Sequence, residues 1–272
     1  MTAIYSKCII ISIYVKYDLF FIEKRYLNMR VFFIGGGNIA RIVADELGGL
    51  VTRSWYYDIK ETGFSGEYIG NTFYIPKEAD FVVECASVGA VKEYGEQVIK
   101  SGKDFYIISS GAFADTSFFE NFLDLLKDSQ SSVFVPSGAI GGIDIINAVK
   151  PFVDYVELNT RKPAKAFNME GLVKTEVVFS GNAKEAISKF PQNANVSVTL
   201  SLAVGSFDKV KVNFLADPSI DENIHEVNIY SSVGNYSVIH KNKPSPNPKT
   251  SYLAPLSLVS AIKKRTSKFQ IG

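Results

Sequence analysis

Two histidines, His225 and His240, are the side chains of this chain best suited to carry a proton near neutral pH. His225 stands in ADPSIDENIHEV, where a polar loop runs into a predicted strand and a side chain can reach a cleft. His240 stands in VIHKNK at the end of another predicted strand, where we expect a solvated surface histidine. Its position at a strand start, taken alone, favours a structural role for His225 as well. The motifs elsewhere in the sequence are therefore needed to distinguish a structural from a catalytic role.

Cationic side chains near these elements could bind an acidic substrate. Arg161 and Lys162 lie in TRKP at the end of a predicted strand. Lys249, Thr250 and Ser251 stand just before a predicted helix. Guanidinium, ammonium and helix N-terminal N–H groups beside a cofactor cleft would suit a substrate that carries carboxylates.

Composition narrows the classes of function. The chain has two cysteines and no cluster with metal-ligand spacing, so we expect a reducing, cytoplasmic setting and no metal site. Its 29 basic and 28 acidic residues nearly cancel and form no long run of one sign. Binding to nucleic acid or to a membrane surface normally requires a basic patch, so neither is an expected partner.

The first 28 residues differ in character from the rest of the chain. They are apolar but interrupted by Lys7, Lys16 and Asp18, and the longest uncharged run, 8–15, is far shorter than the roughly 20 residues that span a bilayer. No small-residue cleavage site precedes Met29. We expect residues 1–28 to be an upstream extension with Met29 as the natural start; an added β-rich arm is the alternative.

A strand, a glycine turn and a helix follow the extension directly. RVFFI is a short apolar run typical of a parallel strand covered on both faces, and it leads into GGGNIA and then IARIVADEL, which has helical spacing. In this pattern Gly35 permits a tight turn and Gly37 lets the backbone approach a pyrophosphate. Asn38 and Ile39 begin the helix whose free N–H groups would face the phosphates.

Asp58 ends the next apolar stretch, SWYYD, about 20 residues beyond the turn, where a carboxylate can accept hydrogen bonds from an adenosine ribose. The same carboxylate would repel a 2′-phosphate. The sequence therefore predicts NAD as cofactor, with NADP possible.

Strands and helices continue to alternate up to VFVPSGAIGG, which predicts a Rossmann-type, doubly wound parallel sheet over residues 29–141. Ligands of such sheets bind beyond the carboxyl ends of the strands. We therefore expect Ala86, Ser87, Gly111 and Ala139 near the nicotinamide half of the cofactor.

The second half has an α+β pattern. Its last three strand-like runs, DKVKVNFLADP, HEVNIYSS and NYSVIHKN, predict a largely antiparallel sheet with helices on one face. We assign residues 142–245 to a catalytic and dimerisation domain, and residues 246–272 to a helix that returns to the first domain. Asn195, in FPQNANV at a predicted helix start, could be a cap.

Short motifs along the chain occur in the order seen in the L-aspartate dehydrogenase family, which the sequence resembles from Met29 to about Lys264. These motifs are GGGNIA, VVECAS, PSGAIGGIDII, TRKP, FPQNANV, ADPSIDENIHEV and PSPNPKTSYLA. The resemblance implies a homodimer that oxidises L-aspartate to iminoaspartate with NAD(P), a reaction that can feed NAD biosynthesis. It also implies that His225 is catalytic and that Ala139 and Asn195 contact the cofactor.

Two features depart from the family pattern. The segment after Asp58 is shorter and richer in glycine, and Pro255 stands where the family tends to carry alanine. Two alternatives also stay open: another two-domain NAD(P) dehydrogenase, of homoserine or semialdehyde type, and an NAD-sensing protein without turnover. A semialdehyde enzyme that uses a thiol would need Cys85, which we expect inside a strand.

Overall fold

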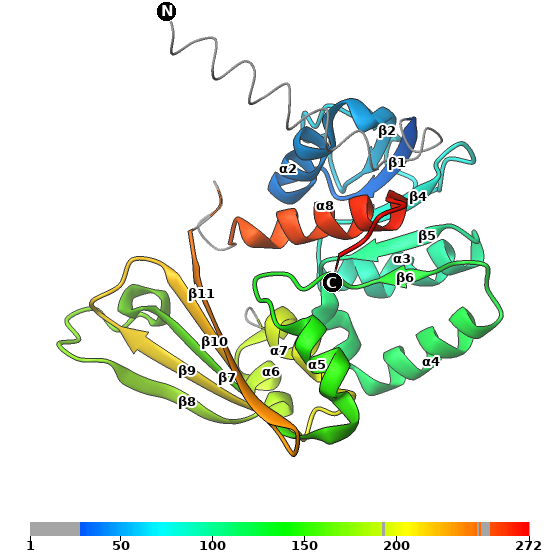
Figure 1. The fold of residues 1–272 in the computed structure, drawn as a ribbon. Helices are drawn as coiled ribbons and strands as arrows, with labels where there is room; N and C mark the ends of the chain where they lie inside the picture. The colour runs from blue at the N-terminus through cyan, green and yellow to red at the C-terminus, as the bar shows by residue number, and fades with distance from the viewer. Residues whose placement is uncertain (1–27, 192–193, 244, 246–250, 272) are drawn as a thin grey trace, which may run out of the picture.

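Two β-sheets, one in each half of the sequence, organise the molecule (Figure 1). The structure is a computed structural model and describes residues 28–191, 194–243, 245 and 251–271. The expectation of an N-terminal extension concerns residues that, apart from Asn28, lie outside this described part.

The first sheet has the order β3-β2-β1-β4-β5-β6, and every neighbouring pair is parallel. Its strands are β1 (Met29–Ile34), β2 (Val51–Tyr57), β3 (Glu67–Tyr68), β4 (Phe81–Glu84), β5 (Asp104–Ile107) and β6 (Val133–Phe134). This arrangement confirms the predicted doubly wound parallel sheet.

Helices cover both faces of this sheet, which explains the continuous apolar runs of its central strands. Val31 and Phe33 of β1 lie in one core with α2 (Asn38–Leu47) and α8 (Leu253–Thr266). Phe32 and Ile34 lie in the opposite core with α3 (Val88–Lys100) and α4 (Thr116–Lys127). No helix stands between β2 and β4; this crossover, which includes the glycine-rich segment after Asp58, contains only β3 and irregular backbone.

Helix α8 lies on the same face of the first sheet as α2 (Figure 1). Leu258, Val259 and Ile262 are its buried contacts with that core. Pro255 is the third residue of the helix, in the first turn, where a backbone N–H has no carbonyl partner within the helix. The proline is therefore compatible with an intact α8.

The second sheet has the order β11-β10-β7-β9-β8. Its strands are β7 (Val153–Pro163), β8 (Glu176–Asn182), β9 (Val210–Asp217), β10 (Asn223–Ser231) and β11 (Gly234–Asn242). Strand β7 lies between β9 and β10 and runs parallel to β9, so the sheet is mixed and mostly antiparallel. The consecutive strands β9 and β10 are consequently not neighbours.

Helices α5 (Ile143–Val149), α6 (Ala183–Lys189) and α7 (Ala194–Val204) pack on one face of this second sheet (Figure 1). Leu158, Val212, Phe214 and Ile229 supply apolar side chains to the core between sheet and helices. Short 3-10 helices connect several elements: η2 (Gly48–Leu50), η3 (Ser110–Ala114), η4 (Lys150–Phe152) and η5 (Ala164–Phe167).

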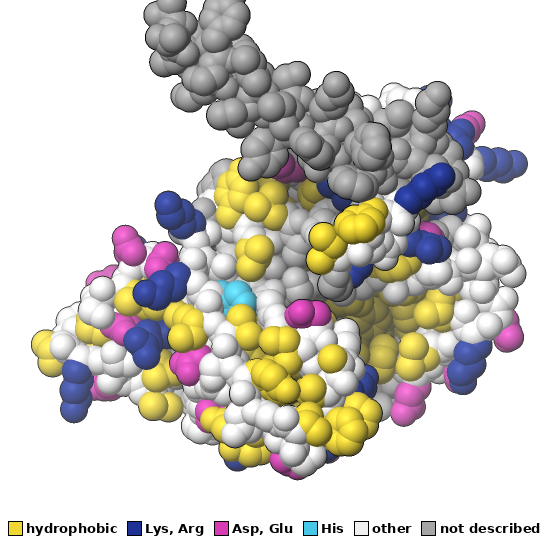
Figure 2. All heavy atoms as spheres, viewed as in Figure 1, with side chains coloured by type: hydrophobic (Ala, Val, Ile, Leu, Met, Phe, Trp, Pro, Cys, Tyr) yellow, Lys and Arg dark blue, Asp and Glu magenta, His cyan; other side chains and the backbone are white. Residues whose placement is uncertain are grey.

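Basic and acidic side chains are interspersed over the face of the molecule shown in Figure 2, with hydrophobic side chains between them. Within the described ranges, no helix has both the length and the apolar character needed to cross a membrane.

Candidate active site

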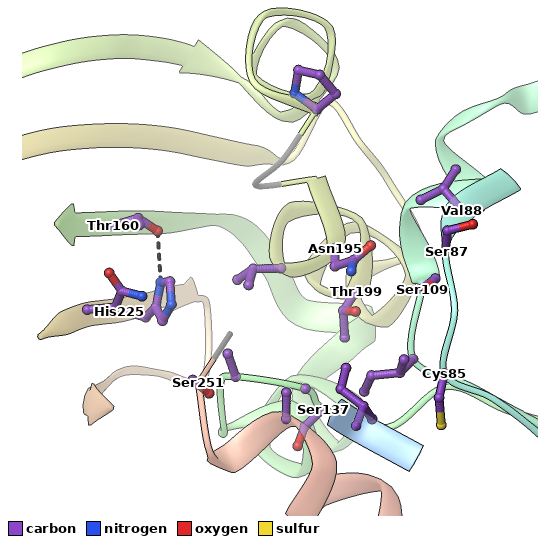
Figure 3. A pocket seen from close by; sticks show the side chains of 18 of the residues that line it. Cys85, Ser87, Val88, Ser109, Ser137, Thr160, Asn195, Thr199, His225 and Ser251 are labelled. Carbon is purple, nitrogen blue, oxygen red and sulfur yellow. Dashed lines mark hydrogen bonds between the residues drawn. The ribbon is translucent and has the colours of Figure 1, made fainter. Parts of the chain in front are cut away.

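A cavity of about 300 Å³ lies where the carboxyl ends of the first sheet meet the second sheet and α7 (Figure 3). This volume is at the lower end of the range for small-molecule sites. It is lined by Ile39, Cys85, Ala86, Ser87, Val88, Ile108, Ser109, Ser137, Gly138, Ala139, Thr160, Lys162, Pro191, Asn195, Val196, Thr199, Asn223, His225, Ser251 and Ala254. Both halves of the chain contribute to this cavity.

His225 projects into the cavity from β10 and is 5% exposed. Its Nδ1 is 2.9 Å from Oγ1 of Thr160 on the neighbouring strand β7 (Figure 3). Burial, and then the charges of Lys162 and His240, lowers the pKa of His225 to about 3. The imidazole is therefore neutral near neutral pH, and Nε2 is the ring nitrogen left to meet a ligand.

Lys162 lines the same cavity because it lies two residues beyond Thr160 on β7, and alternate side chains of a strand share a face. Burial lowers the pKa of its ammonium group. Arg161 does not line the cavity and points to the opposite face, where it forms an ion pair with Asp217 at 3.5 Å. The expectation that Arg161 lies beside the cofactor cleft is therefore wrong.

His240 is half-buried, and the expectation of a solvated surface histidine is wrong. Its Nε2 accepts a hydrogen bond from the N–H of Gly141 at 2.7 Å. Because Nε2 accepts, Nδ1 carries the proton and donates to the backbone oxygen of His225 at 3.2 Å. His240 thus ties the loop that contains Ala139 to the strand that carries His225.

The glycine turn lies next to Ile39 and Ala86 of the cavity wall. Gly35 has a φ of +98°, and a Cβ placed there would lie 2.9 Å from the backbone nitrogen of Ala86. A Cβ on Gly37 would meet no atom within 4 Å, so open space lies in front of this backbone. Helix α2 begins here without a side-chain cap, and its first N–H groups suit phosphate oxygens. These residues fit NAD.

Asp58, directly after β2, lies against the glycine turn. Its Oδ2 accepts from the N–H of Gly36 at 2.9 Å and its Oδ1 from the N–H of Ile59 at 2.8 Å. Asn38, at the start of α2, donates from its amide to the hydroxyl of Ser245 at 3.2 Å. Neither Asp58 nor Asn38 lines the cavity itself, whereas Ile39 does.

Asn195 is the second residue of α7, and its side chain does not cap that helix. Its Oδ1 accepts a hydrogen bond from the N–H of Gly111 at 2.9 Å. The hydroxyl of Ser110 donates to the backbone oxygen of Asn195 at 2.9 Å and lies 2.9 Å from Oγ1 of Thr199. Helix α7 of the second half is thereby joined to η3 of the first half at the cavity wall.

Ala139 lies in a loop that the second half of the chain holds in place. Its backbone oxygen accepts from the amide of Asn242 at 2.7 Å, and the N–H of neighbouring Gly138 donates to the hydroxyl of Ser257 at 3.0 Å. Ser251 lines the cavity, is 5% exposed, and has no hydrogen-bond partner for its hydroxyl among the described residues. Lys249 and Thr250 lie outside the described residues.

Several residues of the site carried no sequence signal that singled them out. Thr160 and Asn223 lie on the same strands as Lys162 and His225, so the two-residue repeat of a strand could have indicated them. Glu84 lies inside the motif VVECAS, but only its burial shows its importance.

Cys85 follows β4 directly and lines the cavity, rather than lying inside the strand as expected. Burial, and then the charge of Glu84, raises the pKa of the Cys85 thiol. The protonated thiol is a poor nucleophile, which speaks against thiol-dependent semialdehyde chemistry. Among the described residues, no group of three or more histidine, cysteine or acidic side chains is arranged to hold a metal ion.

The chain matches two family models, one in each half of the sequence. Residues 144–265 match the model described as aspartate dehydrogenase, C-terminal, and residues 66–136 match homoserine dehydrogenase, NAD binding domain. The L-aspartate dehydrogenase of a Thermotoga species is 45% identical over 245 residues, which are 90% of this chain and 100% of that relative. The chain belongs to the L-aspartate dehydrogenase family.

Further relatives agree with this family assignment. The L-aspartate dehydrogenase of Archaeoglobus fulgidus is 40% identical over 191 residues, 70% of this chain and 78% of that relative. The crystal structure of aspartate dehydrogenase from Thermotoga maritima superposes with a TM-score of 0.82 at 39% identity, covering 90% of this chain and all of that one. The predicted family, the fold and the NAD-binding character of the first domain are confirmed.

Proposed function

We propose that this protein oxidises L-aspartate to iminoaspartate with NAD. One observation carries the proposal: the cavity beside the NAD-binding turn contains a buried, neutral histidine and a lysine on adjacent strands. When bound, NAD supplies the acceptor for the hydrogen and the electron pair that leave the α-carbon. The residues of the chain must then remove a proton from the substrate ammonium and hold its carboxylates.

His225 is the proposed base. Neutral Nε2 accepts the proton from the substrate ammonium, while Thr160 fixes the ring through Nδ1. Lys162 is the proposed partner of a substrate carboxylate. The hydroxyl of Ser251, which has no partner among the described residues, is a further donor. A carboxylate beside Lys162 offsets the charge that helps to depress the pKa of His225, so substrate binding makes the imidazole a stronger base.

The cofactor positions follow from the turn and the loops around the cavity. Gly35, Gly37 and the start of α2 would hold the pyrophosphate, and Asp58 would accept from the adenosine ribose. The cavity residues Ala86, Ser87, Ala139 and Asn195 would surround the nicotinamide. Because Asp58 is a carboxylate at the ribose position, we propose a preference for NAD over NADP.

The activity is tested by incubating the purified protein with NAD and L-aspartate and recording NADH absorbance. L-malate and D-aspartate serve as controls, and NADP replaces NAD in a parallel series. We expect NADH formation with L-aspartate alone and a lower rate with NADP. NAD binding, shown by a thermal shift, without a reaction on L-aspartate would contradict the proposed substrate and favour an NAD-sensing role.

We also propose a homodimer in which a second copy of the chain covers the helix-free face of the second sheet. Within the part of the chain that the structure describes, α5, α6 and α7 pack on the other face of this sheet. On the helix-free face, Tyr155 stacks on Tyr230 with ring centroids 4.4 Å apart, and Ile239 and Val177 are more than half exposed. Exposed apolar side chains on an otherwise polar sheet face are typical of an association surface.

The dimer is tested by light scattering on the eluting protein. Ile239→Lys, at the centre of β11, should yield monomers, whereas Val233→Lys, in the exposed turn between β10 and β11, should leave the dimer intact. A monomeric wild-type protein would contradict the proposal.

We propose the cytoplasm as the compartment of this protein, which the sparse cysteine content supports.

A further inference from the structure

Glu84 is a fully buried carboxylate beneath the cavity, and the mechanism above does not use it. It is the last residue of β4, the strand between β1 and β5 at the centre of the first sheet, and it is 0% exposed. A buried charged or polar side chain is costly unless its oxygens are satisfied by hydrogen bonds. Those hydrogen bonds therefore indicate what the residue holds together.

The carboxylate of Glu84 joins the two loops that follow β4 and β5. Its Oε1 accepts from the N–H of Ala86 at 2.8 Å and from the hydroxyl of Ser109 at 3.0 Å. Its Oε2 accepts from the N–H of Ser109 at 3.0 Å. Ala86 and Ser109 both line the cavity, whereas Glu84 does not, so Glu84 holds two parts of the cavity wall from a position behind them.

The connection continues from Ser109 into the second half of the chain. Ser110 and Gly111, the next two residues, bond to the backbone and side-chain oxygens of Asn195 on α7. Two sets of hydrogen bonds, joined by the covalent chain of residues 109–111, thus connect Glu84 to Asn195. The glycine turn takes no part in it, apart from the close approach of Gly35 to Ala86.

We propose that Glu84 is a positioning residue that sets the place of the nicotinamide ring relative to the substrate by fixing Ala86 and, through residues 109–111, Asn195. The inference rests on the proposed function, because it assigns the nicotinamide to these cavity residues. Glu84 itself touches neither cofactor nor substrate. Its effect is on geometry at the reacting carbon, where a displacement of about 1 Å can cost roughly 100-fold in rate.

The neighbours of Glu84 require a side chain that accepts at both oxygens. Glutamine has nearly the same shape, but its amide NH₂ would replace one oxygen and so face the N–H of either Ala86 or Ser109. Burial raises the pKa of Glu84 to about 7, while the bonds from Ser109 and Ala86 oppose that rise. Glu84→Gln therefore separates the acceptor geometry from the volume of the side chain.

The experiment compares wild type, Glu84→Gln, Ser109→Ala and the control Glu96→Gln, an exposed carboxylate on α3. We expect Glu84→Gln to lower kcat roughly 10–100-fold with little change in the KM for aspartate or the Kd of NADH, because the phosphate-binding turn is intact. Ser109→Ala removes one of the three bonds and should lower kcat less. Glu96→Gln should match the wild type.

Fluorescence of bound NADH gives a second readout that requires no turnover. The emission of the reduced nicotinamide depends on its surroundings, so Glu84→Gln should change the yield and anisotropy of bound NADH at an unchanged Kd. This change would support the inference even if the wild type does not oxidise L-aspartate. Wild-type kcat and fluorescence in Glu84→Gln, with only a lower Tm, would overturn it. If Glu84→Gln does not fold, wild-type values in Ser109→Ala would overturn it.

Discussion

At the scale of single residues, the proposed chemistry of the cavity depends on how burial and neighbouring charge change the pKa of His225. Thr160 bonds Nδ1 of the imidazole, and burial, followed by the charge of Lys162, opposes its protonation. Both neighbours come from β7, so the pairing of β7 with β10 brings them to the histidine. Two predictions test this.

Replacing His225 by alanine should lower turnover by about 10²–10⁴-fold, because proton transfer by a positioned side chain contributes that much. The expected readout is kcat for NADH formation with L-aspartate. Thr160→Val, which removes the hydroxyl that fixes the ring, should have a smaller effect in the same direction. An unchanged kcat with a raised KM for aspartate would assign His225 to substrate binding and contradict its role as a base.

Acid should weaken the fold through His225. Its pKa falls from 6.5 to about 3 on folding, so below pH 6.5 the unfolded chain binds a proton that the folded chain does not. This contribution to stability is present above about pH 6.5 and is lost as the pH falls towards 3. The wild type should therefore lose about 2 kcal/mol of unfolding free energy relative to His225→Gln between about pH 6.5 and about pH 4.5. Urea titrations of both proteins at both pH values measure this difference. An equal change in unfolding free energy for the wild type and His225→Gln would contradict the depressed pKa.

At the scale of elements, the turn between β1 and α2 combines two glycines with different constraints. Gly35 is fixed by its positive φ and by the closeness of Ala86, both of which belong to the folded chain itself. Gly37 has an extended backbone conformation, and a Cβ added to it would meet no atom of the protein within 4 Å. A side chain at this position would therefore clash with a bound ligand rather than with the protein.

Alanine substitutions should separate these two constraints. Gly35→Ala should lower Tm, since a left-handed conformation costs a non-glycine residue about 1–2 kcal/mol and the new Cβ would contact Ala86. Gly37→Ala should leave Tm nearly unchanged and weaken NAD binding, because its methyl group would occupy the space proposed for the pyrophosphate. Calorimetry for Tm and titration for the Kd of NAD give both values. Tight NAD binding by Gly37→Ala would place the pyrophosphate elsewhere.

At the scale of the whole molecule, the two sheets are joined by a shared core as well as by the cavity. Val198 of α7 is 0% exposed and belongs to the same hydrophobic core as Phe105 and Val91 of the first half. The same helix supplies Leu200 to the core of the second sheet. Helix α7 therefore belongs to both halves, and we expect them to unfold together.

Calorimetry should show one thermal transition for the part of the chain that contains both sheets. Val198→Ala should lower the free energy of unfolding by about 2 kcal/mol, through lost burial and a small cavity, and keep that single transition. Val173→Ala, at a side chain that is 92% exposed, should leave stability unchanged. Two separate transitions in the wild type would contradict a shared core.

The sequence by itself determined the parallel sheet, the glycine turn and the family. Short apolar runs such as 31–34 predict the strands, because a strand buried on both faces has no polar positions. The segments between these runs have apolar residues at helical spacing and predict the helices. The motif that contains His225 also stands in one continuous segment. Such features need no knowledge of distant contacts, so they can be predicted from the chain alone.

Only the tertiary structure decided which side chains meet in the cavity. Arg161 and Lys162 are adjacent in sequence, but the helices cover one face of β7, and only Lys162 shares that face with His225. His240 meets Gly141, and Glu84 meets Ser109, across 99 and 25 positions of sequence. Pairings of this kind depend on strand order and on the packing of α7 against η3, which arise from long-range burial that no local pattern specifies.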